Sequence, residues 1–308
     1  MADELATRIV DSISRNAKGT HDHRAAHAKG FCVSGVFIGT AEAAAMTRAA
    51  HFRGIPVAVT VRFSNGSGSL EAADHHVDGR GMAVKFHLPG GEATDLVSIS
   101  QRTFFVRTPE DFLELTDART PDPATGRPDP NAIGDFLIRH PEAEAAFTEV
   151  LSTAPPKSFA TVAYNALHAF RWLDDDGGSR WVRYHWQPDA GAATIEPEQA
   201  KELGRDYLRP EMEQRLTHGP VVFTLEVTIA EGGDDPDDPT AEWPAERRQV
   251  TAGRLELTAM SADQDAECER QVFDPMRLTD GIEPSADPIL NFRPIAYDVS
   301  IRRRLKLG

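Results

Sequence analysis

Alternating hydrophobic and polar residues occur in several parts of this chain and predict β-strands. In residues 57–64 (VAVTVRFS) the apolar side chains share one face of the strand, and Arg62 and Ser64 lie on the other face. The same period of two recurs in four further segments: 81–88, 181–186, 223–230 and 254–260. Regular helical patterns do not separate these strands, so they indicate an antiparallel sheet or barrel.

Helical spacing of apolar residues appears in other parts of the chain. Residues 3–16 predict a short amphipathic helix, and two longer segments, 130–152 and 196–216, show helical patterns opened or interrupted by proline. The sequence LDDDGGSRW at 173–181 has the Asp and Gly content of a hairpin turn. The proline-rich stretch 120–130 and the acidic stretch 231–244 are predicted to be surface loops.

The C-terminal segment 287–308 predicts a helix with an unusual face. Asp287 followed by Pro288 is a favourable N-cap and first helical position. At 100° per residue, Tyr297 lies about 40° round the helix from Arg293, and Arg304 lies about 20° from it. One face therefore carries a phenol and two guanidinium groups. A solvated basic helix with an incidental tyrosine is the simpler interpretation of this spacing.

Composition narrows the possible functions. The chain has 308 residues, of which 40% are hydrophobic, so it can bury a substantial core. Its 33 basic and 48 acidic residues give a net charge of −15, which argues against nucleic acid or an anionic membrane as partner. The N-terminal sequence lacks the pattern of a signal peptide, and we expect a cytoplasmic protein. Cys32 and Cys268 are too few for a disulfide scaffold and are expected to be reduced thiols.

Other candidate motifs are weak. The histidines at 21, 23 and 27 do not have the spacing of a zinc site, and we expect His21 and His23 on the surface. The sequence GSGSLE at 66–71 lacks the third glycine and the context of a dinucleotide-binding loop. The acidic stretch 231–244 lacks the ligand spacing of a calcium loop and is interpreted as a solvated loop.

Several segments, in the same order, resemble the haem catalase family. The sequence RPIAYDVSIRRR at 293–304 is similar to the family's proximal motif, and RAAHAKG at 24–30 to the segment with its catalytic histidine. The resemblance extends through four further segments between these two: 61–69, 78–112, 164–191 and 273–290. It covers roughly residues 20–305.

The resemblance implies a role for each matching residue. Tyrosine is the haem ligand of catalases, which makes Tyr297 the iron ligand and Arg293 the group that keeps it anionic. A free tyrosine has a pKa of about 10, so a phenolate at neutral pH needs about 4 kcal/mol of stabilisation. The remaining positions match the distal catalytic pair His27 and Ser64, the propionate partners Arg24, Arg62 and Arg304, the haem-packing Phe112, and the channel residue Asp78.

The implied mechanism is proton transfer by an imidazole. His27 accepts a proton from peroxide and returns it to the far oxygen, so that the O–O bond breaks and water leaves. The histidine must be neutral at the start, and Ser64 can hold one of its ring nitrogens.

Three departures from the family pattern shape the predicted function. Ile99 stands at the position of a distal asparagine, Ala25 and Ala26 stand where bulkier valines are usual, and the chain is short. These features predict a small catalase-related peroxidase that uses hydrogen or organic peroxides to oxidise small organic donors, with weak or no catalase activity. The alternatives are a minimal true catalase, a fatty-acid hydroperoxide isomerase, or a non-catalytic barrel that binds haem or another small ligand.

The predicted fold is α+β, an antiparallel eight-stranded β-barrel surrounded by helices. One domain is expected over 1–308, with an N-terminal helix in 1–20, the barrel and inserted helices in 21–262, and the proximal helix in the C-terminal segment 263–308. The expected cofactor is haem b. We expect a homodimer, because the long arm by which large catalases form tetramers has no counterpart here.

Overall fold

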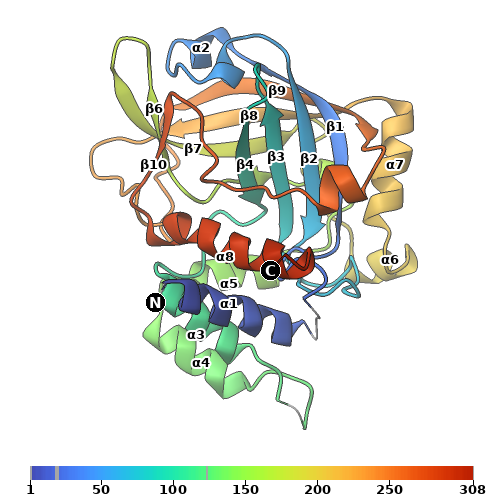
Figure 1. The fold of residues 1–308 in the computed structure, drawn as a ribbon. Helices are drawn as coiled ribbons and strands as arrows, with labels where there is room; N and C mark the ends of the chain where they lie inside the picture. Colours follow the sequence, from blue (N-terminus) through green and yellow to red (C-terminus); the bar gives the residue numbers. More distant parts are fainter. Residues whose placement is uncertain (1, 18–20, 123, 308) are drawn as a thin grey trace.

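The computed structural model describes residues 2–17, 21–122 and 124–307 (Figure 1). The remaining positions, 1, 18–20, 123 and 308, fall within the predicted N-terminal helix region, the proline-rich loop 120–130 and the C-terminal segment, and they lie outside the described residues.

A closed antiparallel β-barrel forms the centre of the molecule. Eight strands of the described chain follow each other in the order β7-β5-β4-β3-β2-β1-β9-β8, and β8 pairs back to β7. Their bounds are β1 Gly30–Gly39, β2 Val57–Asn65, β3 Arg80–His87, β4 Ala93–Ile99, β5 Tyr164–Asn165, β7 Ser179–Pro188, β8 Val221–Ile229 and β9 Gln249–Met260. Two short strands, β6 (Phe170–Leu173) and β10 (Ile282–Pro284), extend the sheet from β7. The predicted eight-stranded barrel is confirmed.

The barrel interior is packed with apolar side chains. The four apolar positions of β2 are at most 4% exposed, and they lie in one cluster with large aromatic residues such as Phe37, Trp186 and Phe223. Arg62 and Ser64, on the outer face of β2, are also buried, at 3% and 4% exposure. The alternation therefore correctly separates two faces, but both of them are covered.

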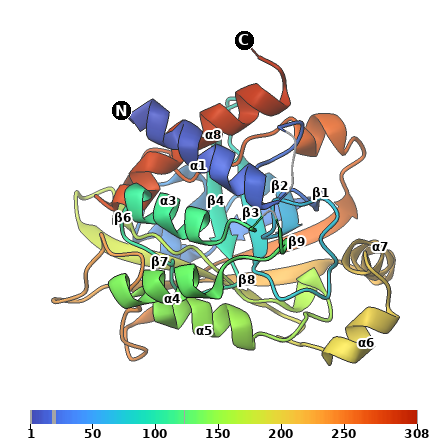
Figure 2. The ribbon, with the colours of Figure 1, turned by 90° about the horizontal axis from the view of Figure 1, so that it is seen from below.

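Helices cover one end of the barrel. Five of them gather there, as Figures 1 and 2 show: α1 (Ala2–Asn16), α3 (Pro109–Ala118), α4 (Pro130–Arg139), α5 (Ala143–Ser152) and α8 (Pro288–Arg304). Helix α1 contacts both α8 and α3. The others, α2 (Ala41–Ala44), α6 (Pro197–Glu202) and α7 (Leu208–His218), lie elsewhere around the barrel. Short turns of 3₁₀ helix cover Ala50–Phe52 and Phe159–Thr161, and a π-turn covers Asp265–Glu269.

Most of the local predictions agree with the structure. The hairpin joins β6 to β7, with Gly177 at a φ of 85°. Helix α8 begins at Pro288, and the Asp287 side chain accepts hydrogen bonds from the backbone amides of Ile289 and Leu290. The segment 130–152 is two helices rather than one, because Pro141 follows the end of α4, and the segment 196–216 is likewise divided into α6 and α7.

The expectation of two reduced cysteines is wrong. Cys32 in β1 and Cys268 in the π-turn form a disulfide, with their Cα atoms 5.5 Å apart. The two positions are 236 residues apart in sequence. They meet because the segment 261–273 lies across β1, where Gln264 hydrogen-bonds to both the N–H and the carbonyl of Cys32. This long-range contact leaves no mark in the spacing of the cysteines.

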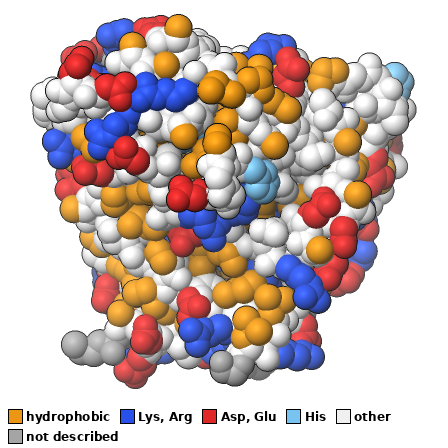
Figure 3. All heavy atoms as spheres, turned by 45° about the horizontal axis from the view of Figure 1, so that its top comes forward, with side chains coloured by type: hydrophobic (Ala, Val, Ile, Leu, Met, Phe, Trp, Pro, Cys, Tyr) orange, Lys and Arg blue, Asp and Glu red, His pale blue; other side chains and the backbone are white. Residues whose placement is uncertain are grey.

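The surface is mixed in charge on the face shown in Figure 3. Acidic and basic side chains are interspersed there with hydrophobic ones. Within the described part of the chain, no helix has both the length and the apolar character needed to cross a membrane.

Candidate active site

A cavity of about 290 Å³ lies between the outer face of the barrel and helices α1, α3 and α8. Strands β2, β3 and β4 form one wall, and α8 contributes much of the opposite wall. The cavity lining includes all eight predicted site residues: Arg24, His27, Arg62, Ser64, Phe112, Arg293, Tyr297 and Arg304. The fold thus brings together residues from both ends of the chain.

His27 is fixed on the barrel side of the cavity. Its Nδ1 lies 3.1 Å from the hydroxyl of Ser64. Its backbone has a φ of 55°, a left-handed conformation that is uncommon outside glycine, and its N–H donates to the carbonyl of Gly66. Gly81 on β3 leaves room for this ring, because a Cβ there would lie 2.7 Å from His27 Nδ1 and 2.7 Å from the Ser64 hydroxyl. The backbone therefore sets the position of the imidazole.

The environment keeps the His27 imidazole neutral. Burial is the main cause, and the positive charges of Arg62 and Arg293 add to it, so that the pKa of His27 falls to about 3. At neutral pH the ring is consequently a proton acceptor. Proton acceptance requires a neutral histidine, and burial and nearby positive charge keep His27 neutral.

Tyr297 faces the cavity from helix α8. Its phenol oxygen accepts two hydrogen bonds from Arg293, one from Nε at 3.0 Å and one from Nη2 at 2.5 Å. Both donors belong to a charged guanidinium, so these are charge-assisted hydrogen bonds. The spacing of the two residues by one helical turn thus brings their side chains into contact.

A buried chain of polar groups stands behind Arg293. His168 Nε2 lies 2.9 Å from Arg293 Nη1, and His168 Nδ1 lies 2.6 Å from the Asp287 carboxylate. Both His168 and Asp287 are almost completely buried. Burial lowers the pKa of His168, and a neutral ring that donates from Nδ1 to Asp287 can accept from Arg293.

Sequence reasoning missed this chain of groups. Asp287 was identified only as a helix cap, and His168 was not singled out within the segment 164–191. Asp287 in fact does both tasks, because one carboxylate oxygen caps α8 and the other contacts His168. His168 and Arg293 are 125 residues apart, so their contact depends on the fold.

Three arginines form a positive cluster at one end of the cavity. Burial lowers the pKa of Arg24. Burial and repulsion from Arg24 lower the pKa of Arg62 to about 9 and that of Arg304 to about 10. Glu269 is their acidic partner, at 2.5 Å from Arg24 and 3.5 Å from Arg62. Glu269 was not predicted, since it lies outside the segments that carried the resemblance.

The remaining predicted positions surround this centre. Ile99 lies opposite Gly81 in the β3–β4 pairing and lines the cavity, as do Ala25 and Ala26. Phe112 lines it from α3 and packs against Phe104 at 5.4 Å between ring centroids. Asp78 is not among the cavity-lining residues. It accepts a hydrogen bond from the backbone of Ser67, and burial raises its pKa.

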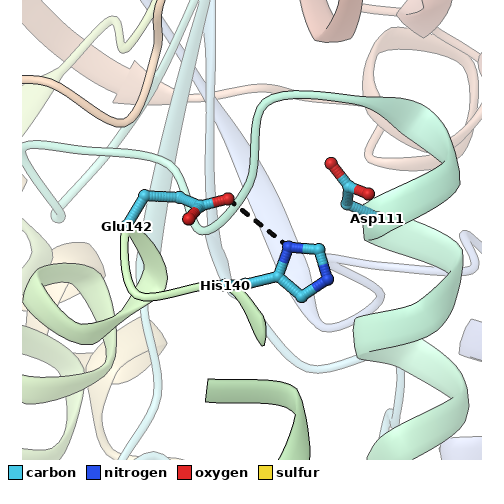
Figure 4. Close-up of side chains that lie close together, drawn as sticks. All are labelled: Asp111, His140 and Glu142. Carbon is cyan, nitrogen blue, oxygen red and sulfur yellow. Dashed lines mark hydrogen bonds and ion pairs between the residues drawn. The ribbon is translucent and has the colours of Figure 1, made fainter. Parts of the chain in front are cut away.

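A second cluster of ionisable groups lies outside the cavity. Asp111, His140 and Glu142 each offer one atom of a kind that can bind a metal ion, and these three atoms lie within 4.8 Å of one another (Figure 4). His140 Nε2 also lies 3.1 Å from Glu114. Burial disfavours the charged ring, but the hydrogen bonds to Glu114 and Glu142 outweigh it and raise the pKa of His140. Both ring nitrogens are thus engaged by carboxylates, which accounts for the cluster as a set of hydrogen bonds around His140.

Comparisons with known proteins agree with this geometry. The family model described as Catalase matches residues 6–308. A catalase-related peroxidase of Mycolicibacterium paratuberculosis is 38% identical over 298 residues, which cover 96% of this chain and 94% of that protein. A catalase-related peroxidase of Synechococcus elongatus is 35% identical over 91% of this chain and 83% of that protein. The chain belongs to the catalase family.

The solved structures give the same fold. A fungal catalase superposes with a TM-score of 0.85 at 25% sequence identity, over 92% of this chain and 59% of that chain. A bacterial catalase gives a TM-score of 0.84 at 25% identity, over 92% of this chain and 57% of that chain. This protein therefore spans less than two thirds of those two catalases, whereas it covers most of the two peroxidases.

Proposed function

We propose that this protein is a haem-dependent peroxidase that reduces hydrogen or organic peroxides and oxidises small organic donors. One observation carries the proposal: a phenol oxygen that accepts two guanidinium hydrogen bonds and a neutral imidazole line the same cavity from opposite walls. The first group suits an anionic metal ligand, and the second suits a proton acceptor. The names of the two most similar relatives described above support the same function.

The cavity fits a haem group. Three arginines and Glu269 carry a net charge of +2, which complements the two propionates of haem. The Nε atoms of Arg62 and Arg304 are buried and have no hydrogen-bond partner among the described residues. Buried cationic donors of this kind call for anionic partners. Much of the remaining cavity lining is apolar, and it includes Phe112 and Val97.

The residues divide the reaction between two walls. Haem, when bound, supplies an iron centre that exchanges electrons with peroxide and with the organic donor. Tyr297 is the proposed iron ligand, and Arg293 keeps its oxygen anionic. His27 takes the proton from the near oxygen of the peroxide and delivers it to the far oxygen, which leaves as water or an alcohol. Ser64 holds the ring by Nδ1 so that its other nitrogen is free for this transfer.

The wall above the reacting atoms favours peroxidase over catalase activity. Ile99 has no hydrogen-bonding group to position a second peroxide molecule. Ala25 and Ala26 are small, which leaves space for organic substrates. A minimal true catalase and a fatty-acid hydroperoxide isomerase are the alternative enzymes that the family membership accommodates, and a non-catalytic binding barrel is the alternative of another class.

One pair of assays tests this proposal. Haem-loaded protein is given peroxide with and without a phenolic donor, while donor oxidation and oxygen evolution are followed together. We expect donor oxidation to exceed oxygen evolution. Rapid oxygen evolution without a donor would support the catalase instead, and a haem spectrum unaffected by peroxide would support the binding barrel.

The identity of the haem and the assembly are finer parts of the proposal. Haem b is proposed because it is held without covalent bonds, and both cysteines of this chain are joined to each other. The pyridine haemochrome spectrum tests this. A homodimer remains our proposal for the assembly, to be tested by light scattering of the haem-loaded protein.

A further inference from the structure

The disulfide lies directly behind the cavity wall. Cys32 is the cross-strand partner of Arg62, so both side chains leave the same, outer face of the sheet. Cys32 and Cys268 are 0% and 1% exposed, and they cluster with Phe273, Ala83 and Val97. These last three residues line the cavity. A single layer of side chains thus separates the sulfur atoms from the proposed haem site.

The disulfide also anchors the segment that organises the arginine cluster. Residues 261–273 continue directly from the end of β9 and lie across β1, and the disulfide at Cys268 cross-links this segment to β1. The backbone carbonyls of Cys268 and Gln271 each accept a hydrogen bond from Arg24 at 2.8 Å, and the carbonyl of Gln271 accepts one from Arg304. Glu269, the residue after Cys268, pairs with Arg24 and Arg62.

Repulsion within the cluster works against this arrangement. Arg24 and Arg304 each lower the pKa of Arg62, so the three cations destabilise one another. Apart from the disulfide, mainly hydrogen bonds such as those of Gln264 to Cys32 hold the segment in place. A cross-link between residues 236 positions apart removes much of the freedom of segment 261–273 to move away from the arginines.

From these contacts we infer that the Cys32–Cys268 pair is a redox switch, called the latch below. Its oxidised form, the disulfide, slows the loss of the cofactor. This inference rests on the proposed function. The disulfide holds 261–273 against the arginines and slows the loss of haem. In the dithiol the segment moves away from the cavity more often, and the carboxylate and carbonyl partners of the arginines move with it. Disulfides in reducing surroundings are typically redox-sensing or catalytic.

Both directions of the switch balance chemically. Opening consumes two equivalents of a small thiol: the S–S bond of the protein breaks, two protein thiols form, and the small thiol becomes a disulfide. Closing consumes one hydrogen peroxide: its O–O bond breaks, two protein thiols lose two electrons and two protons, and two waters form. Peroxide is the proposed substrate, so the conditions that require the enzyme also close the latch.

Haem transfer measures the latch without relying on activity. The haem-loaded protein, oxidised or pre-reduced with dithiothreitol and checked by thiol alkylation and mass spectrometry, is mixed with excess apomyoglobin. We expect haem to leave the reduced protein about tenfold faster, a ratio equal to about 1.4 kcal/mol. Cys268→Ser and Cys32→Ser should show the fast rate with or without reductant. Equal rates for the oxidised and reduced wild type would overturn the inference.

A second measurement uses only the wild type, so it does not depend on the folding of the cysteine variants. It also distinguishes a failure of the latch from a failure of the proposed function. Hydrogen exchange of the wild-type apoprotein should show faster exchange of the amides in 261–273 after reduction, with the amides of β8 unchanged as the internal control. Unchanged exchange in 261–273 would count against the latch. Failure of the wild type to take up haem at all would instead contradict the proposed function, whatever the exchange shows.

Discussion

The two walls of the cavity are built on different principles. On the helix side, Tyr297, Arg293, His168 and Asp287 form a continuous chain of polar contacts that ends at the N-cap of α8. On the barrel side, Ser64 is the only side chain among the described residues that hydrogen-bonds to the ring of His27. Its position depends on backbone contacts and on the missing side chain of Gly81.

This difference matches two kinds of chemical task. An iron-binding phenolate, the role proposed for Tyr297, needs donors and counter-charges that do not move, and a network with a buried end at His168 and Asp287 provides them. A group that accepts and returns a proton must be able to change charge, so strong partners for the charged form would impede it. Burial and nearby cations hold His27 in the neutral form, which is the starting state for proton acceptance.

Removing the barrel-side imidazole should have the largest effect on rate. We expect His27→Ala to retain haem but to react with peroxide about 10²–10⁴-fold more slowly, the range typical of lost acid–base catalysis. Stopped-flow absorption measures the reaction. The control is His23→Ala, which removes a neighbouring histidine that hydrogen-bonds to Gly68 outside the cavity. An undiminished rate in His27→Ala would refute its role.

Breaking the helix-side network should act on stability instead. In His168→Leu, the buried carboxylate of Asp287 and the half-buried guanidinium of Arg293 each lose a partner, and the free energy of unfolding should fall by about 1–3 kcal/mol. Urea denaturation of the apoprotein measures this. The peroxide reaction of the haem-loaded variant should slow less than in His27→Ala. The opposite ranking of the two variants would contradict the division of tasks.

A side chain that can hydrogen-bond at position 99 should sharpen the comparison. We expect Ile99→Asn to raise oxygen evolution severalfold relative to donor oxidation, because an amide can orient a second peroxide beside His27. Ile99→Val, which keeps the wall apolar, is the matched control. If the ratio of the two activities is the same in both variants, Ile99 does not limit catalase activity.

The rate of the peroxide reaction should change little with pH in the range where an ordinary histidine titrates. The pKa of His27 is lowered to about 3, so the imidazole is neutral throughout pH 5–8 and the peroxide rate should be flat there. Stability behaves differently, because in the unfolded chain the histidine binds a proton below about pH 6.5. Its contribution is complete above that pH and is lost as the pH falls towards 3. A peroxide rate that halves near pH 6.5 would contradict the neutral imidazole.

Local patterns in the sequence were enough for part of the fold. The alternation of β2 and the cap of α8 at Asp287 depend on neighbouring residues, and both were predicted correctly. Strand β1 was not, because the run GFCVSGVFIG has no clean alternation and its two faces are both largely covered. The two-residue strand β5 is too short to leave a pattern.

The candidate site, too, was predictable only where the residues involved are close in sequence or match a family motif. Tyr297 and Arg293 lie one turn apart on one helix, so their pairing follows from spacing. His168, Glu269 and the Cys32–Cys268 disulfide come to the site through contacts across more than 100 residues. The resemblance located the residues that match family motifs, but the partners that neutralise or anchor them became visible only in three dimensions.

The visible absorption spectrum of the haem-reconstituted wild type beside that of Tyr297→Phe tests the central claim most directly. After gel filtration, the wild type should keep a haem band and Tyr297→Phe should lose most of it, because the phenol oxygen that α8 presents to the cavity is gone. Retention of haem by Tyr297→Phe with an unchanged spectrum would contradict the account, since the iron would then be held by another group.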